Sequence, residues 1–250
     1  MMANVTAGVV SGAYDSVLAL LYPQSCGACG GPVESRHDGA ACAACWTGTR
    51  IFDKSDTLCW KCGALSQAAV ANDLRQAVRC TRCDDDRFTA ARACGLYEGA
   101  LRASVLSLKR RPQVARRLVM ALWQTQARAP LNEADLIVPV PLHPSRERQR
   151  GFNQAVVLAR ELAPATKLPI DELSLVRRFH TERHRAGMDA RARRDSVAGA
   201  FEVWQPQLIA GRRVLLIDDV FTTGATVSEC AAVLKSAGAA EAYVLTIARA

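Results

Sequence analysis

The most regular hydrophobic pattern in the chain lies between residues 214 and 238. Four apolar residues, Val214–Ile217, form a run that is bounded by Gly211-Arg212-Arg213 before it and by two acidic residues after it. A short, uninterrupted apolar run of this kind is typical of a strand that is buried on both faces of a parallel sheet. Apolar residues at helical spacing follow from Val227 to Leu234, and Gly238 marks the end of the predicted helix.

The chain before this stretch also alternates between strands and helices. We expect strands at 90–97, 136–141, 201–203 and 243–247, and helices that begin at Gly99 and cover 114–126 and 153–163. Alternation of this kind indicates a parallel sheet with helices on its faces. The predicted fold class is therefore α/β.

Length and charge allow two domains and favour an anionic ligand. The chain has 250 residues, half of them hydrophobic, and 32 Lys plus Arg against 24 Asp plus Glu give a formal net charge of +8. A chain of this length can hold two domains, or one domain with an appended module. The positive balance suits nucleotides, diphosphate or nucleic acid, but it does not choose among them.

An apolar segment lies near the N-terminus, from Val5 to Tyr22. It contains Asp15, and no Lys or Arg precedes it. A signal peptide needs a basic start, and a membrane span needs roughly 20 unbroken apolar residues, so neither fits well. We expect an amphipathic helix over residues 1–25, stopped at Pro23, that packs on a domain or a partner, with membrane contact as the weaker alternative. A cytoplasmic location follows from this expectation.

Cysteine spacing defines a second region, for which we expect the boundaries 26–88. Eight of the ten cysteines form C-x-x-C pairs: Cys26/Cys29, Cys42/Cys45, Cys59/Cys62 and Cys80/Cys83. Two such pairs can supply a tetrahedral four-sulfur zinc site, so the chain is predicted to carry an N-terminal double zinc ribbon with two structural zinc ions. We expect sequential pairing of the C-x-x-C units, and the spacing also permits crossed pairing. Disulfides would require export, which nothing at the N-terminus supports.

Aromatic and basic residues lie among these cysteines. They could stack on nucleic acid bases and contact phosphates, or the tryptophans could simply cover the metal sites. Both alternatives stay open for Trp46, Trp60, Arg50, Lys54, Lys61, Arg79 and Arg82. The two remaining cysteines, Cys94 and Cys230, lie in apolar contexts and are predicted to be small buried residues.

The carboxyl end of strand 214–217 and the loop that follows it carry the strongest chemical signal. Asp218 and Asp219 end the apolar run, and Thr222, Thr223, Gly224, Ala225 and Thr226 precede the helix. Backbone N–H groups and hydroxyls at a helix N-terminus favour a phosphate group. Carboxylates repel phosphate, so we expect the two aspartates to face ribose hydroxyls and a hydrated divalent cation such as Mg²⁺.

Residues 214–226, VLLIDDVFTTGAT, resemble the phosphoribosyl-diphosphate signature of the type I phosphoribosyltransferases. The resemblance implies that Asp218 and Asp219 hold the ribose 2′ and 3′ hydroxyls and that residues 222–226 wrap the 5′-phosphate. Phe221 is a departure, because the family more often has a branched aliphatic residue there. The plain alternative is an ordinary strand-to-helix turn.

Three arginines follow the strand at 136–141 in a predicted loop, LHPSRERQRGFNQ. Guanidinium groups can bind phosphate oxygens in pairs, and glycine allows close backbone approach. This loop, together with the cysteine pairs and the TTG turn, resembles the ComF family, phosphoribosyltransferase-like proteins with a zinc ribbon, some of them associated with natural DNA uptake. The resemblance implies that Arg146, Arg148, Arg150 and Gly151 line a pyrophosphate site. A solvated, arginine-rich helix start is the alternative.

Residues 177–200 are too charged to belong to a core. In the resembled family this position is the flexible loop that closes over the active site. Relatives often read T-P-x-Q-S-G-L there, and His184 replaces the glutamine, so the resemblance does not assign the contact with the acceptor. A basic linker is the alternative.

The resulting hypothesis is a phosphoribosyltransferase-like domain over residues 89–250 that binds 5-phosphoribosyl-1-diphosphate with Mg²⁺. It transfers the phosphoribosyl group to a nucleophile, in a context of DNA uptake and of competence or DNA-processing partner proteins. The alternative from another class is a non-catalytic accessory protein that binds single-stranded DNA with the ribbon and basic loops. A metal-dependent adaptor between proteins would explain the ribbon but leave the second half of the chain without a role.

Overall fold

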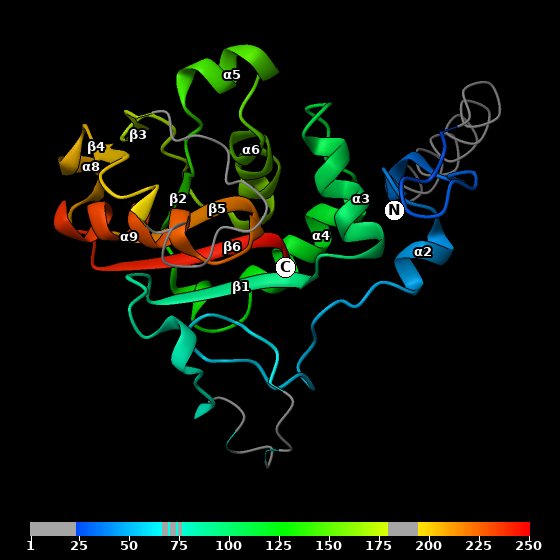
Figure 1. Cartoon of the computed structure of the whole chain (residues 1–250), viewed down its shortest axis with the longest axis horizontal. Helices are drawn as coiled ribbons and strands as arrows, with labels where there is room; N and C mark the ends of the chain where they lie inside the picture. The colour runs from blue at the N-terminus through cyan, green and yellow to red at the C-terminus, as the bar shows by residue number, and fades with distance from the viewer. Residues whose placement is uncertain (1–23, 67–69, 71–73, 75–76, 180–194) are drawn as a thin grey trace, which may run out of the picture.

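A computed structural model describes residues 24–66, 70, 74, 77–179 and 195–250 (Figure 1). The expected helix over residues 1–25 therefore lies almost entirely outside the described residues. In chain order the elements, with η for a 3-10 helix, are η1 Arg36–Asp38, α2 Ala43–Thr47, η3 Thr81–Cys83, β1 Ala90–Leu96, α3 Gly99–Leu108, α4 Arg116–Gln126, η4 Leu131–Glu133, β2 Leu136–Pro139, α5 Pro144–Arg150, α6 Gln154–Thr166, β3 Leu175–Arg177, β4 Phe201–Val203, α8 Pro206–Ile209, β5 Arg213–Phe221, α9 Ala225–Ser236 and β6 Glu241–Arg249.

Four strands form one parallel sheet in the order β1-β6-β5-β2. Side chains on successive residues of a strand point to opposite faces, so each face of the sheet has its own core. Leu215 and Ile217 of β5 pack with α3, α4 and α6, whereas Val214 and Leu216 pack with α9 on the other face. The predicted parallel sheet flanked by helices is confirmed.

β3 and β4 form a separate antiparallel pair, in which Leu175 lies opposite Val203 and Arg177 lies opposite Phe201. The sequence predicted 201–203 as a strand but did not predict β3, and it did not separate β4 from the main sheet. The pair packs against α9 through Leu175 and Phe201, which share a hydrophobic core with Val227.

The cysteine-rich region lies against the sheet and its helices at two places (Figure 1). Cys26, Cys42 and Trp46 pack in the same core as Leu101 of α3. The later part of the region runs along the free edge of β1. There the Phe52 N–H donates to the Cys94 carbonyl at 2.8 Å, and the Ala91 N–H donates to the Lys61 carbonyl at 2.6 Å. The region thereby covers an edge strand that would otherwise expose unpaired backbone groups.

Within the described residues, none of the helices combines the length and the apolar character that crossing a membrane requires.

Candidate functional site

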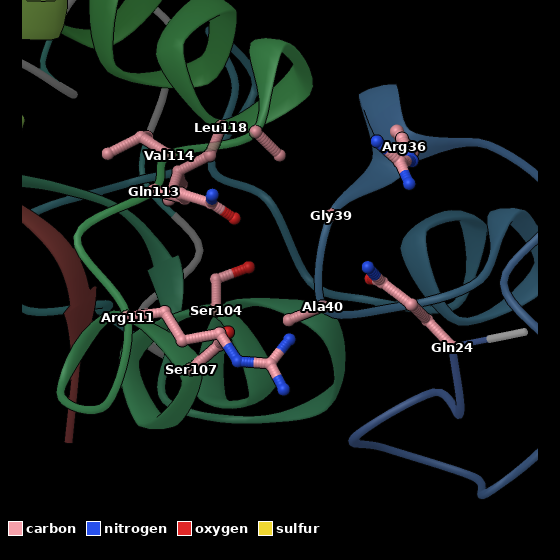
Figure 2. Close-up of a pocket in the computed structure, with 11 residues that line it drawn as sticks. Gln24, Arg36, Gly39, Ala40, Ser104, Ser107, Arg111, Gln113, Val114 and Leu118 are labelled. Carbon is pink, nitrogen blue, oxygen red and sulfur yellow. The ribbon is translucent and has the colours of Figure 1, made fainter. Parts of the chain in front are cut away.

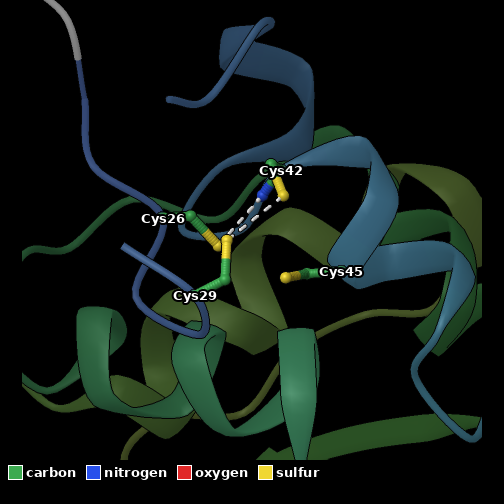
Figure 3. Close-up of side chains that lie close together, drawn as sticks. All are labelled: Cys26, Cys29, Cys42 and Cys45. Atoms are coloured by element: carbon green, nitrogen blue, oxygen red, sulfur yellow. Dashed lines mark hydrogen bonds between the residues drawn. The ribbon is translucent and has the colours of Figure 1, made fainter. Parts of the chain in front are cut away.

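The first cysteine cluster brings together Cys26, Cys29, Cys42 and Cys45 (Figure 3). Their sulfur atoms all lie within 4.8 Å of one another, and the Sγ atoms of Cys29 and Cys42 are 3.8 Å apart. The backbone N–H groups of Ala28 and Cys42 donate to the Cys26 sulfur at 3.4 and 3.3 Å. Donation from the backbone to sulfur is the arrangement expected of zinc knuckles.

The second cluster consists of Cys59, Cys62, Cys80 and Cys83, again within 4.8 Å of one another. Neighbouring sulfurs are 3.5 to 3.7 Å apart. A zinc ion with four sulfurs at about 2.3 Å requires a tetrahedron with edges of about 3.8 Å, so both clusters fit zinc. Sequential pairing of the C-x-x-C units is confirmed, and all ten cysteines are free thiols rather than disulfides.

One thiol in each cluster has a lowered pKa, which favours its thiolate form. Burial raises the pKa of Cys26, but N–H groups of Cys42, Cys29 and Ala28 outweigh burial and lower it to about 6. The same balance, with N–H groups from Cys62, Cys80 and Lys61, lowers the pKa of Cys59 to about 6. Because the thiolate is the form that binds metal, each site has one ligand that is already ionised near neutral pH.

The tryptophans of this region differ in their surroundings. Trp46 is 4% exposed, and its Nε1–H donates to the Asp38 carbonyl at 2.8 Å. Its ring is therefore buried in the first ribbon, the part of the chain that holds the first cysteine cluster. It is not available for stacking on a base. Trp60 is half-buried, with the guanidinium of Arg79 4.9 Å from its ring centroid.

The acid pair lies at the carboxyl end of β5, within the strand itself. The sequence placed the acids at the carboxyl end of this strand, and pairing with β6 continues past them, with Asp218 opposite Thr246 and Phe221 opposite Arg249. The carboxyl ends of β2 and β5 lie at the same edge of the sheet, since these two strands are parallel neighbours. Open α/β sheets bind ligands at this edge.

The two carboxylates have different environments. Asp219 is 7% exposed, and its Oδ2 lies 3.1 Å from the Nζ of Lys109, the residue that follows α3. Burial, and then the charge of Asp219, raises the pKa of Asp218 to about 8. The Asp219 N–H donates to Asp218 Oδ1 at 2.8 Å. The free protein therefore holds one carboxylate paired with a lysine beside a carboxyl group that keeps a proton at neutral pH.

The loop after the acids, residues 222–226 or the TTG loop, leads directly into the N-terminus of α9. Gly224 has φ +81° and caps α9, and the Thr223 hydroxyl accepts the Ala225 N–H at 3.5 Å. The first-turn N–H groups of a helix, here including those of Thr226 and Val227, have no acceptor within the helix. Thr222 is exposed, and Thr223 and Thr226 are half-buried.

The arginine segment forms the short helix α5 rather than the expected loop. Pro144 occupies its first turn, the His143 ring accepts the Ser145 N–H at 3.2 Å, and Gly151 ends it with φ +86°. Arg146 and Arg150 are half-buried, and Arg148 and Gly151 are exposed. The side chain of Arg150 donates to Gln154. These residues follow β2, as predicted, but the three arginines lie on a helix and Gly151 caps its end.

Two further basic residues also belong to this edge, although the sequence did not assign them to the acid pair. Lys109 is one, through its ion pair with Asp219. Arg177 at the end of β3 is the other. Burial, followed by the charge of Arg146, lowers its pKa, and the charge of Asp218 acts in the opposite direction. Arg177 therefore lies within electrostatic reach of both Arg146 and Asp218. Residues 180–194, the larger part of the expected closing loop, lie outside the described residues.

A second candidate site lies between the first ribbon and the helices α3 and α4 (Figure 2). It is a cleft of about 460 Å³, with Arg36 on the ribbon side and Arg111 on the helix side. Ser104, Ser107 and Gln113 supply polar groups, and an adjoining hollow is lined by Arg110. All three arginines are exposed. The cleft has the charge and the hydrogen-bonding groups that an anionic ligand needs.

Comparison with known proteins gives matches to both parts of the chain. Residues 17–84 match the double zinc ribbon domain. The DNA utilization protein YhgH of Escherichia coli K12 is 31% identical over 238 residues, which cover 92% of this chain and 99% of that protein. Competence protein F of Haemophilus influenzae is 35% identical over 138 residues, which cover 55% of this chain and 60% of that protein. A solved structure of glutamine phosphoribosylpyrophosphate amidotransferase from B. subtilis matches with 22% identity and a TM-score of 0.37, covering 57% of this chain and 30% of that one.

The fold and the sites define a class of protein in which a double zinc ribbon is joined to a parallel α/β domain with an acid pair and a TTG loop at its carboxyl edge. Within this class, the match over nearly the full length of YhgH shows the particular family. The chain belongs to the ComF family.

Proposed function

We propose that the protein binds 5-phosphoribosyl-1-diphosphate with Mg²⁺ at the carboxyl edge of the sheet and transfers the phosphoribosyl group to a nucleophile. The observation that carries this proposal is the continuous unit from β5 to α9. It sets two carboxylates and a hydroxyl-lined helix N-terminus side by side, with Lys109 3.1 Å from Asp219. A phosphorylated sugar needs this combination. Its phosphate accepts hydrogen bonds from N–H and hydroxyl groups, whereas its own hydroxyls donate hydrogen bonds to carboxylates.

Each group has a role in this proposal. Thr222, Thr223, Gly224, Ala225 and Thr226 bind the 5′-phosphate, and Asp218 and Asp219 accept hydrogen bonds from the ribose hydroxyls. Arg146, Arg148, Arg150 and Gly151 bind the diphosphate, where guanidinium groups can pair with two oxygens at once. Oxygen-rich surroundings fit Mg²⁺, which would be held chiefly by the diphosphate and would neutralise part of its charge.

Transfer requires no covalent intermediate with the protein. The bond from C1 of the ribose to the diphosphate oxygen breaks, and the diphosphate leaves with the electron pair. The nucleophile then forms the new bond to C1. Positive charge builds up on the ring as this bond breaks, as in glycoside cleavage generally. The protein contributes by fixing the sugar at both ends and by stabilising the negative charge of the leaving group.

Calorimetry tests the proposal directly. Titrating the wild-type protein with 5-phosphoribosyl-1-diphosphate and Mg²⁺ should give one site per chain. The double variant Asp218→Asn/Asp219→Asn should lose at least about tenfold in affinity, because the charged hydrogen bond of Asp219 alone contributes about 1.5–3 kcal/mol. The matched control is Asp135→Asn, which lies beside Arg213 at the opposite end of β5 and should bind like wild type. Equal affinity in the double variant and the wild type would refute the assignment of the pocket.

A second candidate function is binding of single-stranded DNA, and the arginine-lined cleft of Figure 2 is the observation that favours it. The names of YhgH and Competence protein F refer to DNA utilization and competence. We therefore propose DNA uptake as the biological setting, with competence or DNA-processing proteins as partners. A cytoplasmic location fits this setting, because metal-binding thiols need a reducing compartment.

The salt dependence of DNA binding tests the cleft. Each phosphate contact with a single strand contributes about 0.7 to the slope of log K against log salt. Arg36→Gln and Arg111→Gln should each lower the slope by about that amount, measured by fluorescence anisotropy with an oligothymidylate at several salt concentrations. Arg212→Gln, an exposed arginine before β5, serves as control and should leave the slope unchanged. Unchanged slopes in the first two variants would exclude the cleft as the DNA site.

A further inference from the structure

Arg249, at the end of β6, lies between the second cysteine cluster and the start of the TTG loop. Its Nη1 donates to the Cys62 carbonyl at 2.7 Å, and its Nη2 lies 3.7 Å from the Cys62 sulfur. On its other side the guanidinium carbon is 4.4 Å from the centroid of the Phe221 ring. One side chain therefore contacts both a metal ligand and the residue that precedes Thr222.

The Phe221 ring in turn supports the loop. It is 4% exposed and meets Phe88 edge to face, with ring centroids 5.8 Å apart. Gly224 rests directly on it, because a Cβ added there would lie 2.7 Å from the Cζ of Phe221. The left-handed φ of Gly224 and the position of this ring thus fix each other. An aliphatic residue at 221 would offer the guanidinium no aromatic face.

The C-x-x-C unit that ends at Cys62 is itself held close to the sheet by the glycine that follows it. Gly63 has φ +69°, and a Cβ there would lie 2.6 Å from the Ala91 carbonyl oxygen. Cys62 therefore cannot shift along β1 without breaking this close backbone approach. Contacts run without a gap from the cysteine cluster through Arg249 and Phe221 to Gly224.

We propose that Arg249 is a positioning residue that couples the second zinc site to the TTG loop, so that metal at Cys59, Cys62, Cys80 and Cys83 holds the loop in its ligand-binding conformation. Arg249 pairs with the zinc-bound sulfur of Cys62 and clamps the Phe221 ring under Gly224. Coupling between two sites is reciprocal, so a ligand on the loop also retains the metal. The ligand part of this inference rests on the proposed binding of 5-phosphoribosyl-1-diphosphate.

The first test needs no ligand. Hydrogen exchange of the peptide that holds residues 222–226 is measured in the zinc-loaded full chain, in wild type and in Arg249→Met. We expect exchange at the loop to become about tenfold faster in the variant. The matched control is Arg92→Met, because Arg92 also ties the ribbon to β1, through the Trp60 carbonyl at 2.8 Å, but does not contact Phe221 in the described structure. Equal loop exchange in wild type and Arg249→Met would overturn the proposal.

The second test measures the reverse effect. A zinc chelator and N-ethylmaleimide are added together, and peptide mass spectrometry follows alkylation of each cysteine with and without 5-phosphoribosyl-1-diphosphate and Mg²⁺. In wild type the ligand should slow alkylation of the second cluster about 5–50-fold, within the usual range of coupling, and leave the first cluster unchanged. In Arg249→Met this protection should disappear, and in Arg92→Met it should persist. Equal protection in wild type and Arg249→Met would refute the coupling.

The two proposals fail separately. If the ligand does not bind the wild type, the proposed function is lost, and loop exchange still decides whether Arg249 positions the loop. If the ligand binds and protects wild type and Arg249→Met alike, the function stands and the coupling is refuted. Should Arg249→Met not fold, Phe221→Leu removes the ring while keeping the Arg249 contact with Cys62. It should show the same faster loop exchange, and wild-type exchange in it would also overturn the proposal.

Discussion

Cys83→Ser is expected to leave one zinc ion per chain instead of two and to unfold the second ribbon. Structural zinc contributes about 10–16 kcal/mol to folding in isolated zinc-finger peptides. The whole stability of a typical domain is only about 5–15 kcal/mol. Loss of one sulfur therefore removes more than the ribbon can supply from its own packing. Mass spectrometry of bound metal and hydrogen exchange over residues 50–66 measure the two effects.

The consequence should reach the sheet as well. The second ribbon donates and accepts backbone hydrogen bonds along the free edge of β1, including Phe52 to Cys94 at 2.8 Å and Leu96 to Arg50 at 3.2 Å. When the ribbon unfolds, this edge is exposed and can pair with another chain. We therefore expect Cys83→Ser to aggregate on warming, as measured by light scattering.

Cys230→Ala is the matched control. Cys230 is fully buried in α9 and lies outside both clusters, so this variant should keep two zinc ions and lose only a little packing. Two zinc ions in Cys83→Ser, or none in the wild type, would contradict the assignment of structural zinc.

Local spacing explains what the sequence could predict. The C-x-x-C units, the apolar run before Asp218 and the helix after Gly224 are each set by residues within a few positions of one another. These features predicted both metal sites, the parallel sheet and the place of the TTG loop. Cys94 and Cys230 are buried, as predicted from their apolar neighbours.

Helix α5 shows how a usable signal was missed. Its ends carry a proline in the first turn and a left-handed Gly151, and both residue types in these places predict a helix. The segment between them has no apolar stripe, because α5 has no buried residue. A prediction based on hydrophobic periodicity therefore assigned a loop and kept an arginine-rich helix start only as the alternative.

Contacts between distant segments could not be predicted from one sequence. Lys109 and Asp219 are far apart along the chain and meet only because β1 and β5 belong to one sheet. β3 is three residues long and shows no periodicity, and its partner β4 follows after residue 200. The link from Cys62 to Phe221 through Arg249 likewise depends on the sheet bringing three segments together.

Asp218→Asn is expected to raise the melting temperature at pH 8 by about 4–8 °C while weakening ligand binding. The pKa of Asp218 rises from 3.8 to about 8 on folding, because burial and the charge of Asp219 disfavour its carboxylate. Each pKa unit corresponds to about 1.4 kcal/mol. We expect relaxation around the carboxylate to leave about 2 kcal/mol, and 1 kcal/mol shifts the melting temperature of a chain of this size by about 2–4 °C.

The sign follows from proton binding. Between pH 4 and pH 8 the folded protein holds a proton on Asp218 that the unfolded chain has released, so the free energy of unfolding falls as pH rises through this window. The favourable contribution is complete below pH 4 and is lost by about pH 8. Asparagine does not titrate, so the difference between variant and wild type should be absent near pH 4 and largest at pH 8.

Asp135→Asn separates this effect from the general loss of a carboxylate. Asp135 is half-buried and accepts a hydrogen bond from Arg213 Nε at 3.2 Å, away from the acid pair, so its variant should not become more stable as pH rises. Calorimetric melting of the three proteins between pH 4 and pH 8 provides the comparison. A pH-independent difference for Asp218→Asn would mean that its carboxyl group is already ionised in the free protein. A rise with pH would show that the fold gives up stability to keep Asp218 in place, as expected where a residue is retained for binding rather than for packing.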